Sequence, residues 1–529
     1  MTSPCSHACP APCLPGGVTD VRVIECFTRR FNAATNQAGY AGGAHTTNND
    51  ESLADKCGTY SKCLPQASYG KVDLAAFTQF RNATLSGKFA DFEALTLGGK
   101  RTLNGPMGSY AYTFMGADGS QFGDVVVPAP PKVTSEAYAT ELIELYWCSL
   151  LRDVPFSEYP GNPIAIAAAT ELSGRADYQG PRDLAGNVTP ALLFRGEFAG
   201  ETKGPYVSQL LISPTNFGAA SFPQLYTTYM PGVDYMTDLE SWFAVQNGIA
   251  TGLVDQKDAT PRYLHNGRGL AAFTHVDELY QAYFTAYLVL NNMSAPPYNP
   301  ANPYAMSKTE NGFGTFGGPD IASVLAQVAK IALNAVWYQK WVVHLRHRPE
   351  SGGGMVHLMK TGMASFDGPL SLSVLDSQAV AESYAKYGTY LLSQPFPEGS
   401  PAHPAYPTGH GAVGGACITI LKFFFNGAAP LNQLVPTSDG TGLEAWDSSS
   451  GTGEAGILTI NGELHKLAHN ITFGHGLHGG IHWRSDSDAS MVLGEAVAVR
   501  FLKDLVCTYA EPVKIPITLL DGSTMTFAN

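Results

Sequence analysis

The sequence has little charge for its length, and its first residues contain no apolar run. Charged residues make up 15% of the 529 positions and hydrophobic residues 44%. This balance excludes a heavily charged or disordered chain and predicts one extensive buried core. Residues 1–18 lack the apolar stretch of a secretory signal, and no run of about twenty apolar residues predicts a membrane span. The compartment stays open, because a periplasmic or secreted protein could have lost a leader.

Positive charge is also scarce. The formal net charge is −13, which argues against nucleic acid as a partner and makes any basic cluster a local exception. Nine cysteines leave at least one without a partner. Cys57 and Cys63 enclose a short loop and are candidates for a disulfide. Cys148 and Cys417 fall in apolar helical patterns, where buried free thiols are expected.

The basic cluster is the stretch KWVVHLRHRPE at 340–350. An apolar repeat from about Asp320 predicts a helix that ends near Lys340. Arg348 precedes Pro349, which disfavours helical conformation at Arg348, so the two cations need not stay on one helix face. A guanidinium offers paired donors to an oxyanion, and a lysine offers a mobile point charge. The alternative interpretation is a solvated basic helix end.

A second stretch, HPAYPTGHGAVGGA, covers 403–416. Pro407-Thr408-Gly409-His410 precedes an apolar run at 412–425, which predicts a buried helix with Thr408 near its start. A hydroxyl, an approachable glycine amide and a histidine at a helix N-terminus suit an oxyanion, with His410 as general acid or base. In the alternative interpretation, Thr408 only caps the helix and His410 lies at the surface.

The third stretch, HGLHGGIHWRSDSDASMVLGE, covers 475–495. Ser485 and Asp488 have the spacing of a capping box that would open a helix over 486–505, with His482 just before it. His475, His478 and His482 also suggest zinc. We discount a zinc site, because the glycines between these histidines oppose a helix that would align them on one face.

Further elements follow from periodicity and turn residues. The helices expected are Leu74–Thr84, Glu136–Leu151 and Val276–Asn291, the last behind a capping box of Thr274 and Asp277. Asp521-Gly522 predicts a terminal hairpin over Ile515–Phe527. Residues 351–354 and 437–456 are expected to be loops. The Pro, Asn and Gly-rich stretch 295–319 is long enough to be functional or to mark an exchange with a partner chain.

Together the three motifs resemble those of the vanadium-dependent haloperoxidases, in particular the algal and bacterial bromoperoxidase branch of a superfamily that includes acid phosphatases. The resemblance spans about Leu103 to Leu505. It implies a mainly α fold with two four-helix bundles and minor β hairpins. The domains expected are a Pro/Cys-rich arm at 1–20, a region at 21–102 that packs on the core or on a neighbouring subunit, and a helical body at 103–529 with the active site within 337–495.

The resemblance also implies the chemistry. Vanadate would be the cofactor, with phosphate in its place when vanadate is absent. Hydrogen peroxide would oxidise bromide or iodide, with chloride as a further candidate, to hypohalous acid that halogenates small organic nucleophiles. A homo-oligomer between a dimer and a dodecamer is expected. The site residues implied are His482 as the vanadium ligand, Lys340, Arg348, Thr408 and Gly409 around the oxyanion, His410, Lys340 and His482 as catalytic residues, and His403 and Trp337 at the halide pocket.

One departure from the family pattern concerns the cations. The family places an arginine about six residues before the metal-binding histidine, and this position is Gly476 here. His475 and His478 are candidates to replace it at the oxyanion. The departure keeps two alternatives open, an acid phosphatase with the same pocket and an inactive anion-binding homologue.

Overall fold

The computed structural model describes residues 45–111 and 127–529, residues 113, 115 and 116, and parts of 19–32. The Pro/Cys-rich arm with Cys5, Cys9 and Cys13 lies outside the described residues, except for positions 19 and 20. In the described chain Cys57 and Cys63 are both free, so the expected disulfide is wrong. Cys148 and Cys417 are buried free thiols, as expected.

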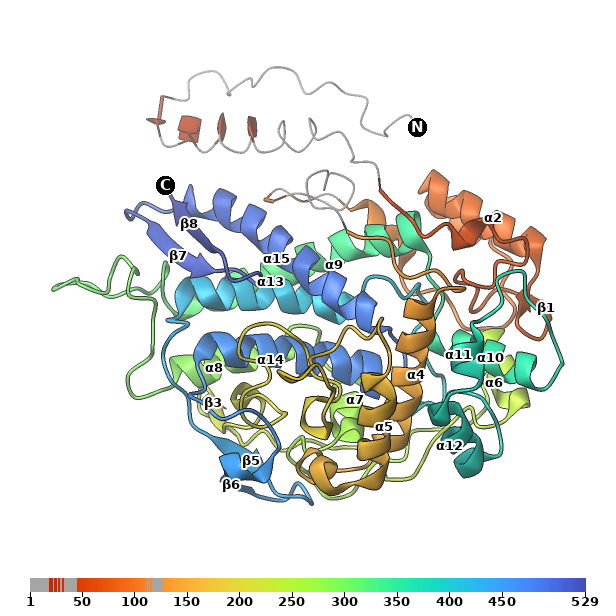
Figure 1. Cartoon of the computed structure of the whole chain (residues 1–529). Helices are drawn as coiled ribbons and strands as arrows, with labels where there is room; N and C mark the ends of the chain where they lie inside the picture. Colours follow the sequence, from red (N-terminus) through yellow and green to blue (C-terminus); the bar gives the residue numbers. More distant parts are fainter. Residues whose placement is uncertain are drawn as a thin grey trace.

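Helices dominate the described chain, and the few strands form short antiparallel hairpins, so the predicted mainly α fold is confirmed (Figure 1). The helices are α2 (Leu74–Ser86), α3 (Phe89–Glu93), α4 (Glu136–Leu151), α5 (Pro163–Ser173), α6 (Leu239–Gln246), α7 (Gly267–His275), α8 (Gln281–Asn291), α9 (Gly318–Tyr338), α10 (Pro349–Lys360), α11 (Leu372–Leu375), α12 (Gln378–Tyr387), α13 (Gly409–Phe424), α14 (Ile460–Phe473) and α15 (Arg484–Val506). The hairpins pair β1 (Gln66–Ser68) with β2 (Lys71–Val72), β3 (Thr215–Phe217) with β4 (Ala220–Phe222), β5 (Leu434–Pro436) with β6 (Leu443–Ala445), and β7 (Lys514–Thr518) with β8 (Thr524–Ala528).

Helix α13 is the centre of one helical group. All of its residues are buried, as expected for a helix that is apolar on every side. It packs against α9, α14 and α15. Glycines allow the closest of these contacts, because a Cβ at Gly415 would lie 2.0 Å from the carbonyl oxygen of Met491, and one at Gly494 would lie 2.0 Å from that of Ala412. Side chains at these glycines would push α13 and α15 apart.

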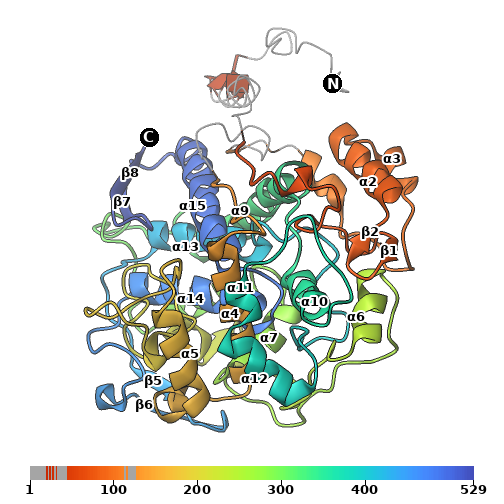
Figure 2. The same cartoon turned by 45° about the vertical axis from the view of Figure 1, so that its right-hand side comes forward.

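A second group forms around α4, which packs against α5, α10, α11 and α12. Figure 2 shows α4 running down between α5 and the α10–α12 region. The helix has the predicted bounds, and Ser135 caps it by accepting a hydrogen bond from the amide of Tyr138. Its buried Glu141 and Glu144 reach arginines of the third sequence motif and of the segment before α10. These ion pairs tie the second helical group to the first.

Residues 45–102 pack on the segment that carries the basic cluster. The amide of Tyr60 donates to the carbonyl of Leu345 at 2.6 Å, and its ring meets Trp341 edge-on, with centroids 5.8 Å apart. Lys62 and Glu350 form a buried ion pair at 2.6 Å. Figure 2 shows α2, α3, β1 and β2 together on this side of the body. Residues 45–102 thus cover one side of the segment between α9 and α10.

Three expected elements differ from the structure. The helix expected from Val276 begins at Gln281 instead, because the Thr274 hydroxyl donates back to the Leu270 carbonyl within α7 at 3.0 Å and caps nothing ahead of it. Residues 351–354 are helical, inside α10. Helix α15 begins at Arg484, before the expected capping box. The polar side chains of the expected capping box, Ser485 and Asp488, instead bind residues that are distant in the sequence. Their spacing alone does not reveal these partners.

By length and composition, one helical stretch of the described chain, Gly318–His344, could cross a membrane. Its apolar residues repeat at helical spacing, and its buried face includes Ile321, Leu325 and Val328. That face packs against α13 and α15. The apolar residues of this stretch therefore pack in the protein core.

A buried ionic cluster predicts a pH dependence of stability. His469 on α14 contacts Glu201 through Nδ1, and its Nε2 lies 3.2 Å from a carboxylate oxygen of Asp488. Burial alone would lower the pKa of His469, but the Glu201 charge and the hydrogen bonds to both carboxylates outweigh it and raise the pKa to about 9. The imidazolium therefore joins α14, α15 and the segment near 201 in the folded protein only.

We expect this contribution to the free energy of unfolding to be complete below pH 6.5, the ordinary pKa, and to be lost as the pH rises through 9. One unit of pKa corresponds to about 1.4 kcal/mol, so the full effect is about 3 kcal/mol. Urea unfolding of the wild type and His469→Gln between pH 6 and pH 10 measures it. The difference between the two proteins should shrink with pH, and a constant difference would contradict the assignment.

Candidate active site

Two helices change to π-helical geometry where they reach the same region. Helix α9 continues as a π-helical segment over Gln339–His344, which contains Lys340. Helix α14 continues as a π-helical segment over Gly474–His478, which contains His475. Such bulges turn side chains away from the regular helix face and are frequent at functional sites. Two segments are therefore wound more loosely than an α-helix. One is the predicted helix end near Lys340, and the other is the glycine-rich approach to His482.

Lys340 and Arg348 are both buried. The Lys340 ammonium donates to the carbonyl oxygens of Pro404 and Ala405 at 3.0 and 2.6 Å. Arg348 donates to the carbonyls of His403 and Ile481 at 2.9 and 2.8 Å. Both cations are buried, so the interpretation as a solvated helix end is wrong, and within the described chain neither cation forms a direct ion pair with a carboxylate.

The lowered pKa values of Lys340 and Arg348 show that burial disfavours their charged forms. Burial lowers the pKa of Lys340 well below its ordinary value, and the neighbouring Arg348 lowers it further. Burial also lowers the pKa of Arg348 to about 10. Buried charges are ordinarily paired or bound to a ligand. Two unpaired cations in one place are therefore the mark of an anion site.

His482 is completely buried between a cation and a carboxylate. Its Nδ1 lies 2.9 Å from Asp486 Oδ2, and its Nε2 lies 2.8 Å from Nη1 of Arg348. A guanidinium only donates and a carboxylate only accepts, so Nδ1 carries the proton and Nε2 presents its lone pair. Burial, Arg348 and Lys340 hold the pKa of His482 well below its usual range. The neutral imidazole is in the state that a metal ligand requires.

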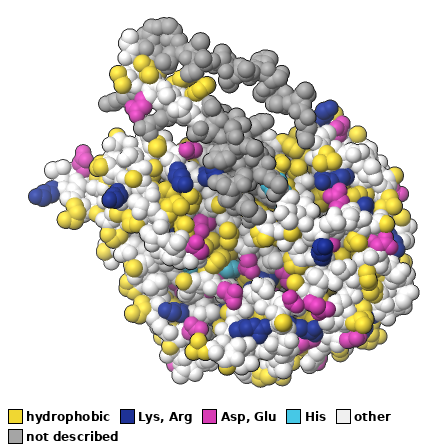
Figure 3. Space-filling model, turned by 45° about the horizontal axis from the view of Figure 1, so that its top comes forward, with side chains coloured by type: hydrophobic (Ala, Val, Ile, Leu, Met, Phe, Trp, Pro, Cys, Tyr) yellow, Lys and Arg dark blue, Asp and Glu magenta, His cyan; other side chains and the backbone are white. Residues whose placement is uncertain are grey.

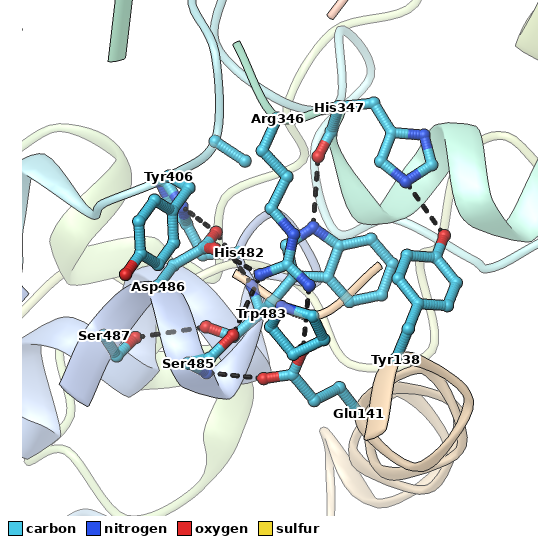
Figure 4. A network of polar contacts seen from close by, with 12 residues as sticks. Tyr138, Glu141, Arg346, His347, Tyr406, His482, Trp483, Ser485, Asp486 and Ser487 are labelled. Atoms are coloured by element: carbon cyan, nitrogen blue, oxygen red, sulfur yellow. Dashed lines mark hydrogen bonds and ion pairs between the residues drawn. The ribbon is translucent and has the colours of Figure 1, made fainter. Parts of the chain in front are cut away.

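Figure 4 shows what holds Asp486 in place. Arg346 donates to its Oδ1 at 2.7 Å and to Glu141 at 2.9 Å. The amide of Trp483 donates to Oδ2 at 3.2 Å, which caps α15, and the Arg346 guanidinium lies over the Trp483 ring at 4.7 Å. The carboxylate that orients His482 is thus fixed from three sides by buried groups.

His410 lies at the start of α13 and contacts a second carboxylate. Its Nε2 is 3.0 and 3.1 Å from the two oxygens of Asp277. A carboxylate only accepts, so this contact places a proton on Nε2. The ring of His475 lies 4.0 Å from the His410 ring and 5.5 Å from the His482 ring, measured between centroids. His475 therefore lies beside both His410 of the second motif and His482 of its own motif.

Thr408 is the residue before α13, as predicted, but its hydroxyl makes no cap hydrogen bond. The oxygen is buried without any partner among the described residues. Nδ1 of His475 is likewise buried and unpartnered. These two atoms are thus among the buried polar atoms of the described residues that are available to a ligand. Gly409 follows Thr408 at the helix N-terminus, where backbone amides lack helical partners.

His403 and Trp337 form one wall of this cluster. Nη2 of Arg348 lies 2.9 Å from Nδ1 of His403, and the His403 ring lies 4.7 Å from that of Trp337. The Lys340 ammonium is 5.9 Å from the Trp337 ring centroid. A Cβ on Gly409 would lie 3.2 Å from Trp337, so this wall reaches the helix terminus.

His478 is not brought to the cluster. Its Nδ1 lies 3.1 Å from the sulfur of Cys148, and its Nε2 lies 2.9 Å from the hydroxyl of Tyr206. The Tyr206 hydroxyl donates to the Phe194 carbonyl at 2.6 Å, so it accepts from Nε2. With both ring nitrogens engaged elsewhere, His478 is removed from the oxyanion residues, and the three histidines of this motif do not converge on one point.

Comparison with known proteins identifies the family. The chain is 31% identical over 527 residues to a vanadium-dependent bromoperoxidase from Ascophyllum nodosum, and the match covers 95% of this chain and 91% of the relative. This chain belongs to the vanadium-dependent bromoperoxidase family. A vanadium-dependent bromoperoxidase from Corallina officinalis is 30% identical over 546 residues, covering 88% of this chain and 90% of the relative.

Structure supports the same family. The homohexameric structure of the second vanadate-dependent bromoperoxidase from Ascophyllum nodosum superposes with a TM-score of 0.89 at 28% identity, over 98% of this chain and 94% of that one. A family model described as the VCPO second helical-bundle domain matches residues 321–506. That interval begins inside α9 and contains α13, α14, α15 and all three sequence motifs.

Gly476 occupies the position where the bromoperoxidase pattern expects an arginine. A Cβ at Gly476 would lie 3.2 Å from the Cβ of His482 and 3.4 Å from Oγ of Ser487. The position therefore adjoins the imidazole that faces Arg348. Among the described residues no other arginine enters this space, since Arg346 and Arg484 are engaged by Glu141 and Glu144. His475 precedes Gly476, and its ring lies 5.5 Å from the His482 ring.

The bromoperoxidase-family site also contains residues that sequence reasoning missed. Asp277 was assigned to a capping box, and Asp486 to a helix start, yet each binds a histidine of the cluster. Arg346 lies in the basic stretch at 340–350, and its contact with Asp486 is not apparent from the sequence. The one available signal was the four-residue separation of His482 and Asp486 across the start of a helix. Asp277 precedes His410 by 133 residues, and no local pattern connects them.

Vanadate, the cofactor the family implies, fits the residues present. Two buried cations without carboxylate partners, an unpartnered hydroxyl and the amides of a helix N-terminus are donors suited to a tetrahedral oxyanion. Nε2 of His482 offers a nitrogen lone pair with a fixed tautomer, as metal-binding histidines require. These residues come from α9, the segment before α10, the N-terminus of α13 and the approach to α15.

Proposed function

We propose that this protein is a vanadate-dependent haloperoxidase that uses hydrogen peroxide to oxidise bromide or iodide, with chloride as a further candidate, to hypohalous acid. The single observation that carries the proposal is a buried histidine whose unprotonated Nε2 accepts from Arg348, within the electrostatic reach of a second buried cation, Lys340. The kinship with named bromoperoxidases over nearly the whole chain supports it. Small organic nucleophiles would receive the halogen.

In this proposal His482 would hold vanadium through Nε2, and Lys340, Arg348, Thr408 and the amide of Gly409 would neutralise the oxyanion. His475 completes the pocket on the side of Gly476, through the imidazole nitrogen that lacks a partner. When bound, vanadate supplies a Lewis acid that activates hydrogen peroxide toward a halide without a change of oxidation state. Lys340 would contribute a buried positive charge that stabilises negative charge on the bound oxyanion.

His410 takes and returns the protons of this chemistry at Nδ1. Asp277 holds the opposite nitrogen at 3.0 Å and so fixes both tautomer and ring orientation. His403 and Trp337 shape the wall beside Arg348, where the family handles the halide. Burial and the charge of Arg348 lower the pKa of His403 well below its usual value, so this side chain is neutral at the wall.

A direct test is reconstitution of the purified protein with orthovanadate, followed by assays of bromide and iodide oxidation with hydrogen peroxide. We expect oxidation that depends on both vanadate and peroxide. The kinship with bromoperoxidases does not favour an acid phosphatase or an inactive homologue. Phosphatase turnover that vanadate only inhibits would overturn the proposal, as would vanadate binding with no turnover in either assay.

We also propose that phosphate occupies the pocket when vanadate is absent. The supporting observation is that the oxyanion donors are shared, whereas only vanadium needs the Nε2 ligand. Titration calorimetry with inorganic phosphate, followed by displacement with orthovanadate, tests this point. Competition at one site is expected, and independent binding of the two anions would contradict it.

Thr408→Val separates the role of the hydroxyl in the site from its role in folding. Loss of an unpartnered buried hydroxyl should leave the vanadate-free protein as stable as the wild type or about 1 kcal/mol more stable. Oxyanion affinity should fall roughly tenfold to a hundredfold, since a hydrogen bond to a charged group contributes about 1.5–3 kcal/mol. Calorimetry and thermal unfolding measure the two quantities.

Thr419→Val is the matched control. Thr419 is equally buried on the same helix, but its hydroxyl donates to the Gly415 carbonyl at 2.7 Å. This variant should lose stability and keep its oxyanion affinity. A Thr408→Val protein that is clearly destabilised, with unchanged affinity, would assign the hydroxyl to the fold alone.

We further propose that the chain assembles as a homo-oligomer. The support is the superposition on a homohexameric bromoperoxidase over 98% of this chain. Sedimentation velocity of the purified protein tests the proposal, and a species with the mass of one chain would contradict it.

A further inference from the structure

The long loop between α8 and α9 carries a projection that the active site does not use. Residues 305–311 are all exposed, and the loop extends away from the body at the left of Figure 1. Met306 is 89% exposed and Phe313 is 72% exposed. The projection on the same side of Figure 3 bears hydrophobic, basic and acidic side chains together. Two large apolar side chains on one projecting segment suit an interaction surface.

The base of this loop is firmly held. The Tyr304 hydroxyl donates to Glu511 at 2.6 Å, and the Thr315 hydroxyl donates to the same carboxylate oxygen. Phe316 is buried, with its ring centroid 4.7 Å from that of Tyr509 and 6.1 Å from that of Phe423. On its returning side the loop folds tightly on itself, since a Cβ at Gly312 would lie 2.6 Å from the carbonyl oxygen of Phe316. The projection therefore keeps a defined shape for recognition.

The charges at its tip are self-complementary. Lys308 and Glu310 flank Thr309 and are exposed, and neither forms an ion pair within the described chain. The turn is fixed by a hydrogen bond from the Glu310 amide to the Ser307 hydroxyl at 3.1 Å. A twofold axis near Thr309 would set Lys308 of each copy against Glu310 of the other. An isologous interface requires this reciprocity of one surface with itself.

We propose that residues 305–314 form a self-association arm that packs against the same segment of a second copy of this chain about a twofold axis. The inference rests on the homo-oligomer part of the proposed function and names the surface that would form one interface. Met306 and Phe313 supply the apolar contact, because exposed ion pairs contribute little affinity on their own. The reciprocal charges set the register and exclude other partners.

Charge reversal tests the arm. Lys308→Glu and Glu310→Lys each create two like-charge contacts across the twofold axis, so each single variant should associate at least tenfold more weakly. The double variant Lys308→Glu/Glu310→Lys restores both pairs in reversed sense and should recover the wild-type mass. Sedimentation velocity over a concentration series of the full chain measures these masses. Phe313→Asp should also shift the protein toward smaller species.

Leu184→Asp is the control, because Leu184 is fully exposed on a different loop and should leave the mass unchanged. A wild-type chain that sediments as a single copy would overturn the arm. Unchanged masses in both single charge variants would also overturn it, as would failure of the double variant to recover.

The test is independent of the oxyanion site. The loop packs through Phe316 against the C-terminal end of α13, whereas His410 lies in its first turn. The fourteen residues between His410 and Phe424 span roughly 20 Å at the helical rise. All arm variants should therefore bind vanadate like the wild type. A change in sedimentation mass in variants that still bind vanadate would support the self-association arm. If neither the wild type nor any variant bound vanadate, the proposed enzymatic function would be refuted, but the proposal of the arm would be unaffected.

Discussion

His482→Ala is expected to abolish tight vanadate binding while the protein stays folded. The imidazole is the nitrogen donor for vanadium, and its tautomer is set by Asp486 at 2.9 Å and by Arg348 at 2.8 Å. Its removal leaves Lys340 and Arg348, so oxyanions should still be attracted, but only by charge and hydrogen bonds. Vanadate affinity should fall at least about a hundredfold, which corresponds to about 2.7 kcal/mol.

Comparing the affinity of His482→Ala for phosphate with its affinity for vanadate tests whether the imidazole acts as a vanadium ligand. Phosphate needs the cations and the hydroxyl but forms no bond to the imidazole, so its affinity should change much less than that of vanadate. In the variant the two anions should bind with similar strength. Titration calorimetry and vanadium-51 NMR measure the binding, with His410→Ala as the variant expected to retain it. Equal losses for both anions would mean that His482 only supports the shape of the pocket.

His410→Ala should reduce bromide oxidation by about 10²–10⁴-fold, the range typical for loss of a positioned acid–base group. Vanadate binding should persist, because the Lys340 and Arg348 contacts come from other elements. The loss should therefore appear in kcat of the vanadate-saturated enzyme. Steady-state kinetics at saturating vanadate, together with calorimetry, separates the two effects. If His410→Ala kept the full kcat of the wild type, His410 would have no role in turnover.

Asp277→Asn distinguishes proton transfer from simple packing. The amide keeps a hydrogen bond acceptor within reach of Nε2 of His410 but removes the negative charge. We expect a smaller fall in kcat than in His410→Ala, a changed pH profile of turnover, and unchanged vanadate affinity. An identical pH profile would show that the carboxylate only fills space beside the ring.

Sequence patterns predicted the helices whose apolar residues repeat over many turns. The bounds of α4 match the expected Glu136–Leu151, and α13 begins directly after Thr408. Such helices bury a continuous face, so local order and burial reinforce each other. The predicted hairpin near the C-terminus appears as β7 and β8 for a similar reason, since its strands alternate about a tight turn.

Local patterns failed where a polar side chain had two possible partners. Thr274 and Ser485 both have the spacing of capping residues, yet one donates back into α7 and the other accepts from Arg346. The glycines after Phe473 were expected to prevent a helix, but the chain continues in π-helical geometry. In each case distant packing contacts outweigh the local preference, which amounts to only about 1 kcal/mol per residue.

The sequence by itself determined which side chains are candidates for the proposed chemistry, because Lys340, Arg348, Thr408, His410 and His482, which carry the family resemblance, can be read without a fold. Only the tertiary structure decided how they are arranged. It buried the two cations without carboxylates, fixed His482 through Asp486, joined His410 to Asp277 across 133 residues, and chose His475 over His478. The physical reason is that periodicity reports which face of a segment is buried, whereas a tautomer or an unpaired charge depends on partners supplied by other segments.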